Sequence, residues 1–89
     1  MNPHAVLDEA KATIGERGRD YGEVELNFDR IASLFNMTTS SPAKIDQYDV
    51  AMLMVCLKLS RIRQSPDKRD SYVDLINYAA FACELAGAK

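Results

Sequence analysis

The 89-residue sequence predicts an all-α fold, a small four-helix bundle with short loops. Apolar residues recur at intervals of three and four in several separate stretches, which is the period of an α-helix. No stretch shows sustained alternation of apolar and polar residues, and no hairpin turn separates two apolar runs, so the sequence gives no strand signal. A chain of this length forms one domain, which we expect to span residues 1–89.

The run VAMLMVCL, residues 50–57, is the most apolar stretch and predicts the central helix. Because the run has no polar face, we expect this helix to be buried on most sides, in a core or between subunits. A bilayer span needs about 20 apolar residues, so the run is too short to cross a membrane. A chain this small buries only about 60–65% of its extended surface. We therefore expect the bundle to be completed by homo-oligomerisation.

Capping residues and glycines predict the ends of the helices. The first helix opens at Asn2-Pro3 and ends near residue 16. The central helix begins at Asp46 with Asp49 three residues later, a spacing typical of a capped helix start that could also hold a metal ion. The other helices run from about residue 23 to 36 and from about residue 70 to 85. Their expected core faces are Val24, Phe28, Ile31 and Phe35 on the second helix, and Tyr72, Leu75, Ile76, Ala79 and Cys83 on the last.

The composition of the chain bears on which partners it binds and on the cellular compartment in which we expect it. A net charge of −2 and a pI near 5.3 argue against nucleic-acid binding, which normally needs a basic surplus. Residues 1–15 carry charges where a signal peptide would have an apolar core, so we expect a cytoplasmic protein with no membrane association. Cys56 and Cys83 lie in apolar contexts without Cys or His at ligand spacing, which predicts buried free thiols in a reducing compartment.

Two polar rows could carry chemistry. Lys58 and Arg61 lie one turn apart on the central helix, and Asp70, Asp74 and Asn77 recur at spacings of four and three on the last helix. Two antiparallel helices joined by a short loop would bring these rows together. The rows then either form ion pairs that fix the helix register or line a polar pocket for a phosphorylated small molecule.

In the pocket interpretation, Lys58 and Arg61 bind phosphate, and the carboxylates of Asp70 and Asp74 hold Mg²⁺. An aromatic side chain, either Tyr21 or Phe28, stacks on a base. Asn77 is a further candidate ligand-binding residue.

Asn27 lies on the same helical stripe as Val24 and Ile31. A buried amide at this position needs a hydrogen-bond partner. Asn27 therefore either braces the neighbouring loop or faces a ligand.

Three segments in order, RGRDYGEVELNFDRIA, DVAMLMVCLKLSRI and SPDKRDSYVDLINYAA, resemble a family of small phage and prophage proteins of poorly defined function. The shared pattern is a DYG turn followed by N-F-x-x-I-A, D-V-A…K-x-x-R and D-S-x-x-D-x-x-x-Y-A helices, over about residues 14–82. The family is described as similar to MazG-type nucleotide pyrophosphohydrolases. This resemblance implies an oligomeric all-α bundle that hydrolyses a nucleoside triphosphate with Mg²⁺, in the cytoplasm of an infected or lysogenic bacterium.

The sequence departs from the MazG-type pattern at the metal site. That pattern supplies an E-E-x-x-E helix followed by an E-x-x-D helix. Here Asp70 and Asp74 stand four residues apart rather than three, and the central helix carries Lys58 and Arg61 in place of acids. Glu23, Glu25 and Asp49 could substitute for these acids only if the packing brings them to the site.

Three functions therefore stay open. A Mg²⁺-dependent pyrophosphohydrolase would release pyrophosphate and lose this activity in Asp74→Asn. A non-catalytic protein that sequesters a nucleotide or cyclic nucleotide as a counter-defence would be stabilised by its ligand in EDTA, and Arg61→Ala would abolish the effect. A helical interaction protein would show neither behaviour.

Overall fold

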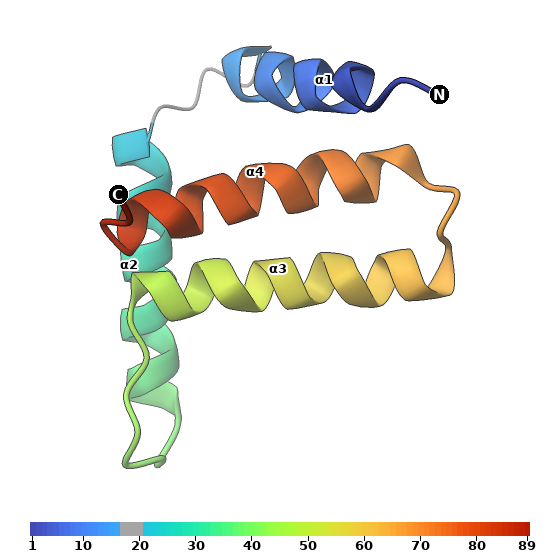
Figure 1. Ribbon diagram of the computed structural model, residues 1–89. Coiled ribbons are helices and arrows are strands. Elements are labelled where there is room, and N and C mark those ends of the chain that lie inside the picture. The colour runs from blue at the N-terminus through green and yellow to red at the C-terminus, as the bar shows by residue number, and fades with distance from the viewer. Residues whose placement is uncertain (17–20) are drawn as a thin grey trace.

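The computed structural model describes residues 1–16 and 21–89, which form an all-α bundle. No strand occurs in these residues, so the predicted fold class is confirmed. Within the same residues, no helix is both long and apolar enough to cross a membrane. The helices are α1 (Pro3–Glu16), α2 (Tyr21–Thr38), α3 (Gln47–Gln64) and α4 (Arg69–Leu85), shown in Figure 1.

An antiparallel hairpin of α3 and α4 forms the centre of the fold (Figure 1). The start of α3 is closed by a capping box, as the sequence predicts. The Asp46 carboxylate accepts a hydrogen bond from the backbone N–H of Asp49 at 3.0 Å, and the Asp49 carboxylate accepts one from the N–H of Asp46 at 2.9 Å. After α4, Gly87 adopts a positive φ of 66°, a conformation that glycine reaches without a steric penalty.

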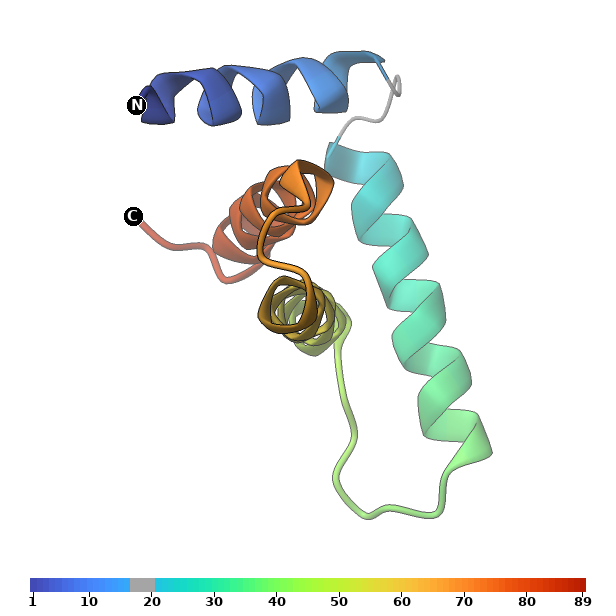
Figure 2. The ribbon, with the colours of Figure 1, turned by 90° about the vertical axis from the view of Figure 1, so that its right-hand side faces the viewer.

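The second helix, α2, crosses this hairpin steeply where α3 begins and α4 ends (Figures 1 and 2). Its buried side chains Val24, Phe28 and Ala32 pack against the hairpin in the main hydrophobic cluster. The loop that follows α2 is fixed by Asn36, whose amide donates to the Ile45 carbonyl at 2.8 Å and accepts from the Ile45 N–H at 3.0 Å. These two bonds set the distance between the end of α2 and the start of α3.

The first helix, α1, packs against α4 on the side away from α3 (Figure 2). Its contact centres on Ala10, which is buried. An ion pair between Glu9 and Arg69 joins the two helices at the surface.

Within a single chain, α3 is not buried on most sides, so its burial in the core of one chain is ruled out and its burial between subunits stays a prediction. Only Val50 and Ala51 are buried on this helix, whereas Met52, Leu53 and Leu57 are exposed. The physical reason is that α2 covers only the first turns of α3 and α4 covers one further face. The remaining faces of α3 have no neighbouring helix among the described residues.

Two predicted core faces are also wrong in part. On α2, Val24 and Phe28 are buried but Ile31 and Phe35 are exposed, because the buried stripe continues through Ala32 instead. On α4, the buried residues are Ser71, Val73, Asn77 and Ala82, while Ala79 and Cys83 of the predicted face are exposed. The packed face of α4 is therefore the one that carries Asn77, on nearly the opposite side from the prediction.

Cys56 and Cys83 are free thiols, as predicted, but both are exposed rather than buried. Cys83 borders a shallow surface pocket together with Tyr48 and Met52 of α3, and its side chain is still exposed there. The apolar residues around each cysteine in the sequence led to the prediction of burial. The prediction is wrong because the sequence context does not show which helix faces the neighbouring helices cover.

Candidate functional site

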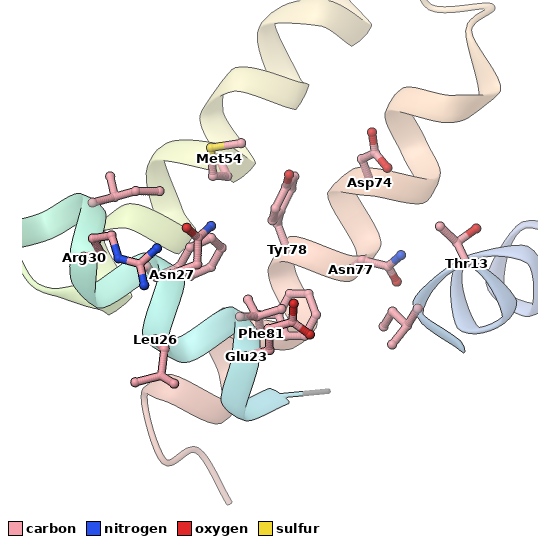
Figure 3. A pocket seen from close by; sticks show the side chains of 14 residues that line it. Thr13, Glu23, Leu26, Asn27, Arg30, Met54, Asp74, Asn77, Tyr78 and Phe81 are labelled. Carbon is pink, nitrogen blue, oxygen red and sulfur yellow. The ribbon is translucent and has the colours of Figure 1, made fainter. Parts of the chain in front are cut away.

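A cavity of about 460 Å³ lies in the angle between α2 and α4 (Figure 3). The end of α1 contributes Thr13 and Ile14 to one side of it, and α3 contributes Met54. Pockets for small molecules commonly have volumes of about 300–1,000 Å³. The cavity is therefore large enough for a ligand of that size, and it is built from all four helices.

Aromatic side chains form the apolar wall of the cavity. Phe28 of α2 and Tyr78 of α4 stand with their ring centroids 6.3 Å apart and their planes tilted by 36°. Phe28 is buried, whereas Tyr78 and the neighbouring Phe81 are half-buried and keep part of their surface open to the cavity. An aromatic wall of this kind suits a flat, unsaturated ring.

Polar side chains reach the same cavity from two helices. Asn27 and Arg30 come from α2, and Asp74 and Asn77 come from α4, with Tyr78 between the two groups in the view of Figure 3. Asn77 is buried on the packed face of α4, while Asn27 and Arg30 are exposed. The arrangement offers two amides and a guanidinium to a bound molecule, next to the carboxylates of Asp74 and Glu23, which also line the cavity.

The predicted contact between the polar rows of α3 and α4 is confirmed at one position. The Lys58 ammonium nitrogen lies 2.9 Å from a carboxylate oxygen of Asp74, and the two side chains are only 13% and 19% exposed. This ion pair fixes the register of the α3–α4 hairpin, which is one of the two roles predicted for the rows. It also places Lys58 next to a residue that lines the cavity.

The structure brings some of the predicted site residues together and separates others. Asn27, Asp74 and Asn77 line the cavity, as does Phe28, one of the two aromatic candidates. Lys58 joins them through its ion pair with Asp74.

Arg61 and Asp70 do not line the cavity and are exposed. The side chain of Tyr21 lies outside the described part of the structure. Of the predicted DYG turn, Asp20 also lies outside the described residues, whereas the backbone of Tyr21 and Gly22 begins α2.

Sequence reasoning missed Arg30 and Thr13, which line the cavity, and raised Glu23, which also lines it, only as a substitute acid for the metal site. Arg30 lies three residues after Asn27, so the same helical spacing that singled out Asn27 would have placed it nearby. Thr13 carried no such signal, because its hydroxyl donates to the Glu9 carbonyl within α1 and its position at the cavity depends on how α1 packs.

The predicted Mg²⁺ site does not fit the donor set that the structure presents. In residues 1–16 and 21–89, no group of three or more His, Cys, Asp and Glu side chains could hold a metal ion. Asp74 is engaged by Lys58, and Asp70 lies outside the cavity. Mg²⁺ prefers several oxygen ligands at close to octahedral geometry, and this pair of carboxylates does not supply them.

Comparison with known proteins places the chain in a family. A domain model described as a domain of unknown function, DUF6378, matches residues 5–86, which is nearly the whole chain. The chain belongs to the DUF6378 family. This DUF6378 chain is also similar to the Gene 55 protein of Mycobacterium phage D29, with 38% identity over 76 residues that cover 84% of the chain and 49% of the relative.

The Gene 55 protein of Mycobacterium phage L5 is similar as well, at 33% identity over 76 residues, 84% of the DUF6378 chain and 48% of the relative. The chain thus spans about half the length of the curated relatives it matches. No solved structure matches it. The predicted resemblance to small phage proteins of undefined function is confirmed, while the similarity to MazG-type enzymes stays a prediction.

Proposed function

We propose that this protein binds a nucleotide, or a related phosphorylated molecule with an aromatic ring, in the cavity between α2 and α4. The observation that carries the proposal is the meeting of an aromatic wall with an arginine in one cavity of about 460 Å³. A base would lie against Tyr78 and Phe81, and the amides of Asn27 and Asn77 would bond its polar edge.

Arg30 supplies the cation for the phosphate in this proposal. A guanidinium binds phosphate oxygens in a bidentate manner and keeps its charge at any physiological pH. Within the described residues, Arg30 forms no ion pair with a carboxylate, so its donors are available. Lys58 is paired with Asp74, so we propose that it contributes less to phosphate binding than Arg30 does.

The proposal favours binding without a metal ion over Mg²⁺-dependent hydrolysis. Asp74 is held by a lysine, and Asp70 does not reach the cavity, so two candidate metal ligands do not act together there. A cationic side chain can bind phosphate directly and needs no metal to bridge it. This is the sequestering function, the non-catalytic alternative raised by the sequence.

A thermal-shift panel of nucleoside mono-, di- and triphosphates and cyclic dinucleotides tests the proposal, run once in EDTA and once in Mg²⁺. A ligand at a hundred times its Kd stabilises the folded state by about 2.7 kcal/mol. In a domain of this size that raises Tm by about 10–20 °C. We expect the shift in EDTA, its loss in Arg30→Ala, and its retention in Arg63→Ala, a matched change at an exposed arginine outside the cavity.

Other outcomes separate the remaining functions. A shift that appears only with Mg²⁺, together with release of pyrophosphate from a triphosphate, would replace the binding proposal with the pyrophosphohydrolase. If no member of the panel changes Tm, the binding proposal is wrong and the helical interaction protein is the function that remains.

A further inference from the structure

Large apolar side chains on α2 and α3 are exposed along one side of the molecule. They form what we name the apolar corner, defined by Ile31, Leu34, Phe35, Leu53 and Leu57. Their exposed fractions lie between 41% and 56%, which is high for leucine, isoleucine and phenylalanine. Isolated exposed apolar residues are ordinary, but a contiguous group of them marks an interaction surface.

Helical periodicity places these residues together. Ile31 follows the buried Phe28 by three positions, and Leu53 follows the buried Val50 by three. Phe35 follows the buried Ala32 by three positions, and Leu57 follows the half-buried Met54 by three. An offset of three residues rotates a side chain by about 60° from the core stripe of its helix. Each helix therefore has a second apolar stripe beside its core stripe.

The crossing of the two helices places the two stripes on neighbouring arms of the molecule. α2 crosses the start of α3 and continues well past it, so that its second half and α3 form the two arms of an L (Figure 1). Ile31 of α2 and Met54 of α3 line the same cavity, so the second stripe of α2 begins beside α3. The residues of the apolar corner come from the two arms of this L and are exposed in the described chain.

The chain exposes more surface than a compact monomer of the same mass. A compact monomer of 9.9 kDa exposes about 5,200 Å², whereas this chain exposes 6501 Å². Its radius of gyration is 14.3 Å, against about 12 Å for a compact domain of this length. The excess of about 1,300 Å² exceeds the roughly 800 Å² that each partner contributes to a stable interface.

We infer that a second copy of this chain docks into the apolar corner. An L-shaped surface with two apolar arms is self-complementary, because a two-fold axis can place the α2 arm of one copy on the α3 arm of the other. The second stripes themselves consist of uncharged residues: α3 continues its stripe with Ser60 and Gln64, and α2 flanks its own with Asn27 and Thr38. Arg30 and Arg61 lie at the edges of the stripes, one turn from Leu34 and Leu57. The inference does not depend on the proposed ligand.

The docked copy would also border the cavity. Ile31 belongs to the apolar corner and lines the cavity at the same time, so the two surfaces are continuous. A second subunit seated in the corner would therefore lie at the edge of the candidate site.

Sedimentation equilibrium of the full chain and two leucine variants tests the inference. Leu57 and Leu59 lie two positions apart on α3, are 43% and 51% exposed, and point to nearly opposite sides of the helix. We expect the wild-type chain and Leu59→Glu to be dimeric, and Leu57→Glu to have the mass of a monomer with unchanged helical circular dichroism. Phe35→Glu repeats the test on the other arm and should also give a monomer.

Two results would overturn the inference. A wild-type chain that stays monomeric at high micromolar concentration has no self-association through any face. A monomer in Leu59→Glu with an intact dimer in Leu57→Glu would place the interface on the opposite side of the α3–α4 hairpin.

Discussion

Replacing Lys58 by methionine should destabilise the α3–α4 hairpin, because it leaves the Asp74 carboxylate without the cation that lies 2.9 Å away. Breaking a buried ion pair costs about 3–5 kcal/mol, whereas exposed pairs contribute about 0–1 kcal/mol. With side chains 13% and 19% exposed, this pair is nearer the buried limit. We expect a loss of about 2 kcal/mol, which lowers Tm by about 8–16 °C.

The assay is a double-mutant cycle of Lys58→Met and Asp74→Asn, followed by chemical denaturation at one protein concentration. Each single change leaves a charged partner behind, while the double variant removes both charges. The double variant should therefore be at least about 1 kcal/mol more stable than the sum of the single effects predicts. The more exposed pair of Arg69 and Glu9, at 53% and 42%, serves as the matched control and should show almost no coupling.

Single effects that add within about 0.5 kcal/mol would refute this reasoning. They would mean that water screens the pair despite its low exposure. The double-mutant cycle also helps to interpret binding measurements. It gives the loss of stability in Asp74→Asn, which must be known before a loss of ligand binding in this variant is assigned to the cavity.

Three further substitutions test the fold, each measured by thermal and urea denaturation. Asn36→Ala removes both hydrogen bonds to the Ile45 backbone and should cost about 1–3 kcal/mol, and an unchanged Tm would show that the loop holds without them. Asp46→Ala should cost about 1 kcal/mol by opening the capping box, while Asp46→Asn should recover most of that loss. Ala51→Leu places extra methyl groups at a position with 0% exposure and should cost about 1–3 kcal/mol, so a stabilised variant would reveal unfilled space there.

The helices could be predicted because their signals are local. Asp46 and Asp49 form a capping box from residues three apart, and the last helix ends shortly before Gly87, which adopts a positive φ. The ion pair of Lys58 and Asp74 also followed from spacing, since two antiparallel helices joined by a short turn can meet in few registers.

The packed faces could not be predicted, because they depend on how closely the helices approach. Each helix has an alanine at its buried contact, namely Ala10, Ala32, Ala51 and Ala82. Small side chains let helix axes come close, so these alanines select the packed face even where larger apolar residues lie on another side. A hydrophobic pattern gives alanine little weight, which is why the wrong stripe of α4 was expected to be buried.

The candidate site could be predicted only where it lies on the hairpin. Asp74 and Asn77 share a face of α4 by spacing alone. Arg30 reaches the same cavity because α2 crosses the hairpin steeply, and this crossing depends on contacts between residues far apart in sequence.

The attachment of α1 has a consequence for how the cavity exchanges its contents with solvent. Of the described side chains of this helix, only Ala10 is buried, and the ion pair to Arg69 is exposed. A segment with so little buried apolar surface opens at a small fraction of the global unfolding free energy. Because Thr13 and Ile14 form one side of the cavity, detachment of α1 widens the entrance while α2, α3 and α4 stay folded. Amide hydrogen exchange should accordingly be faster throughout α1 than in the α3–α4 hairpin.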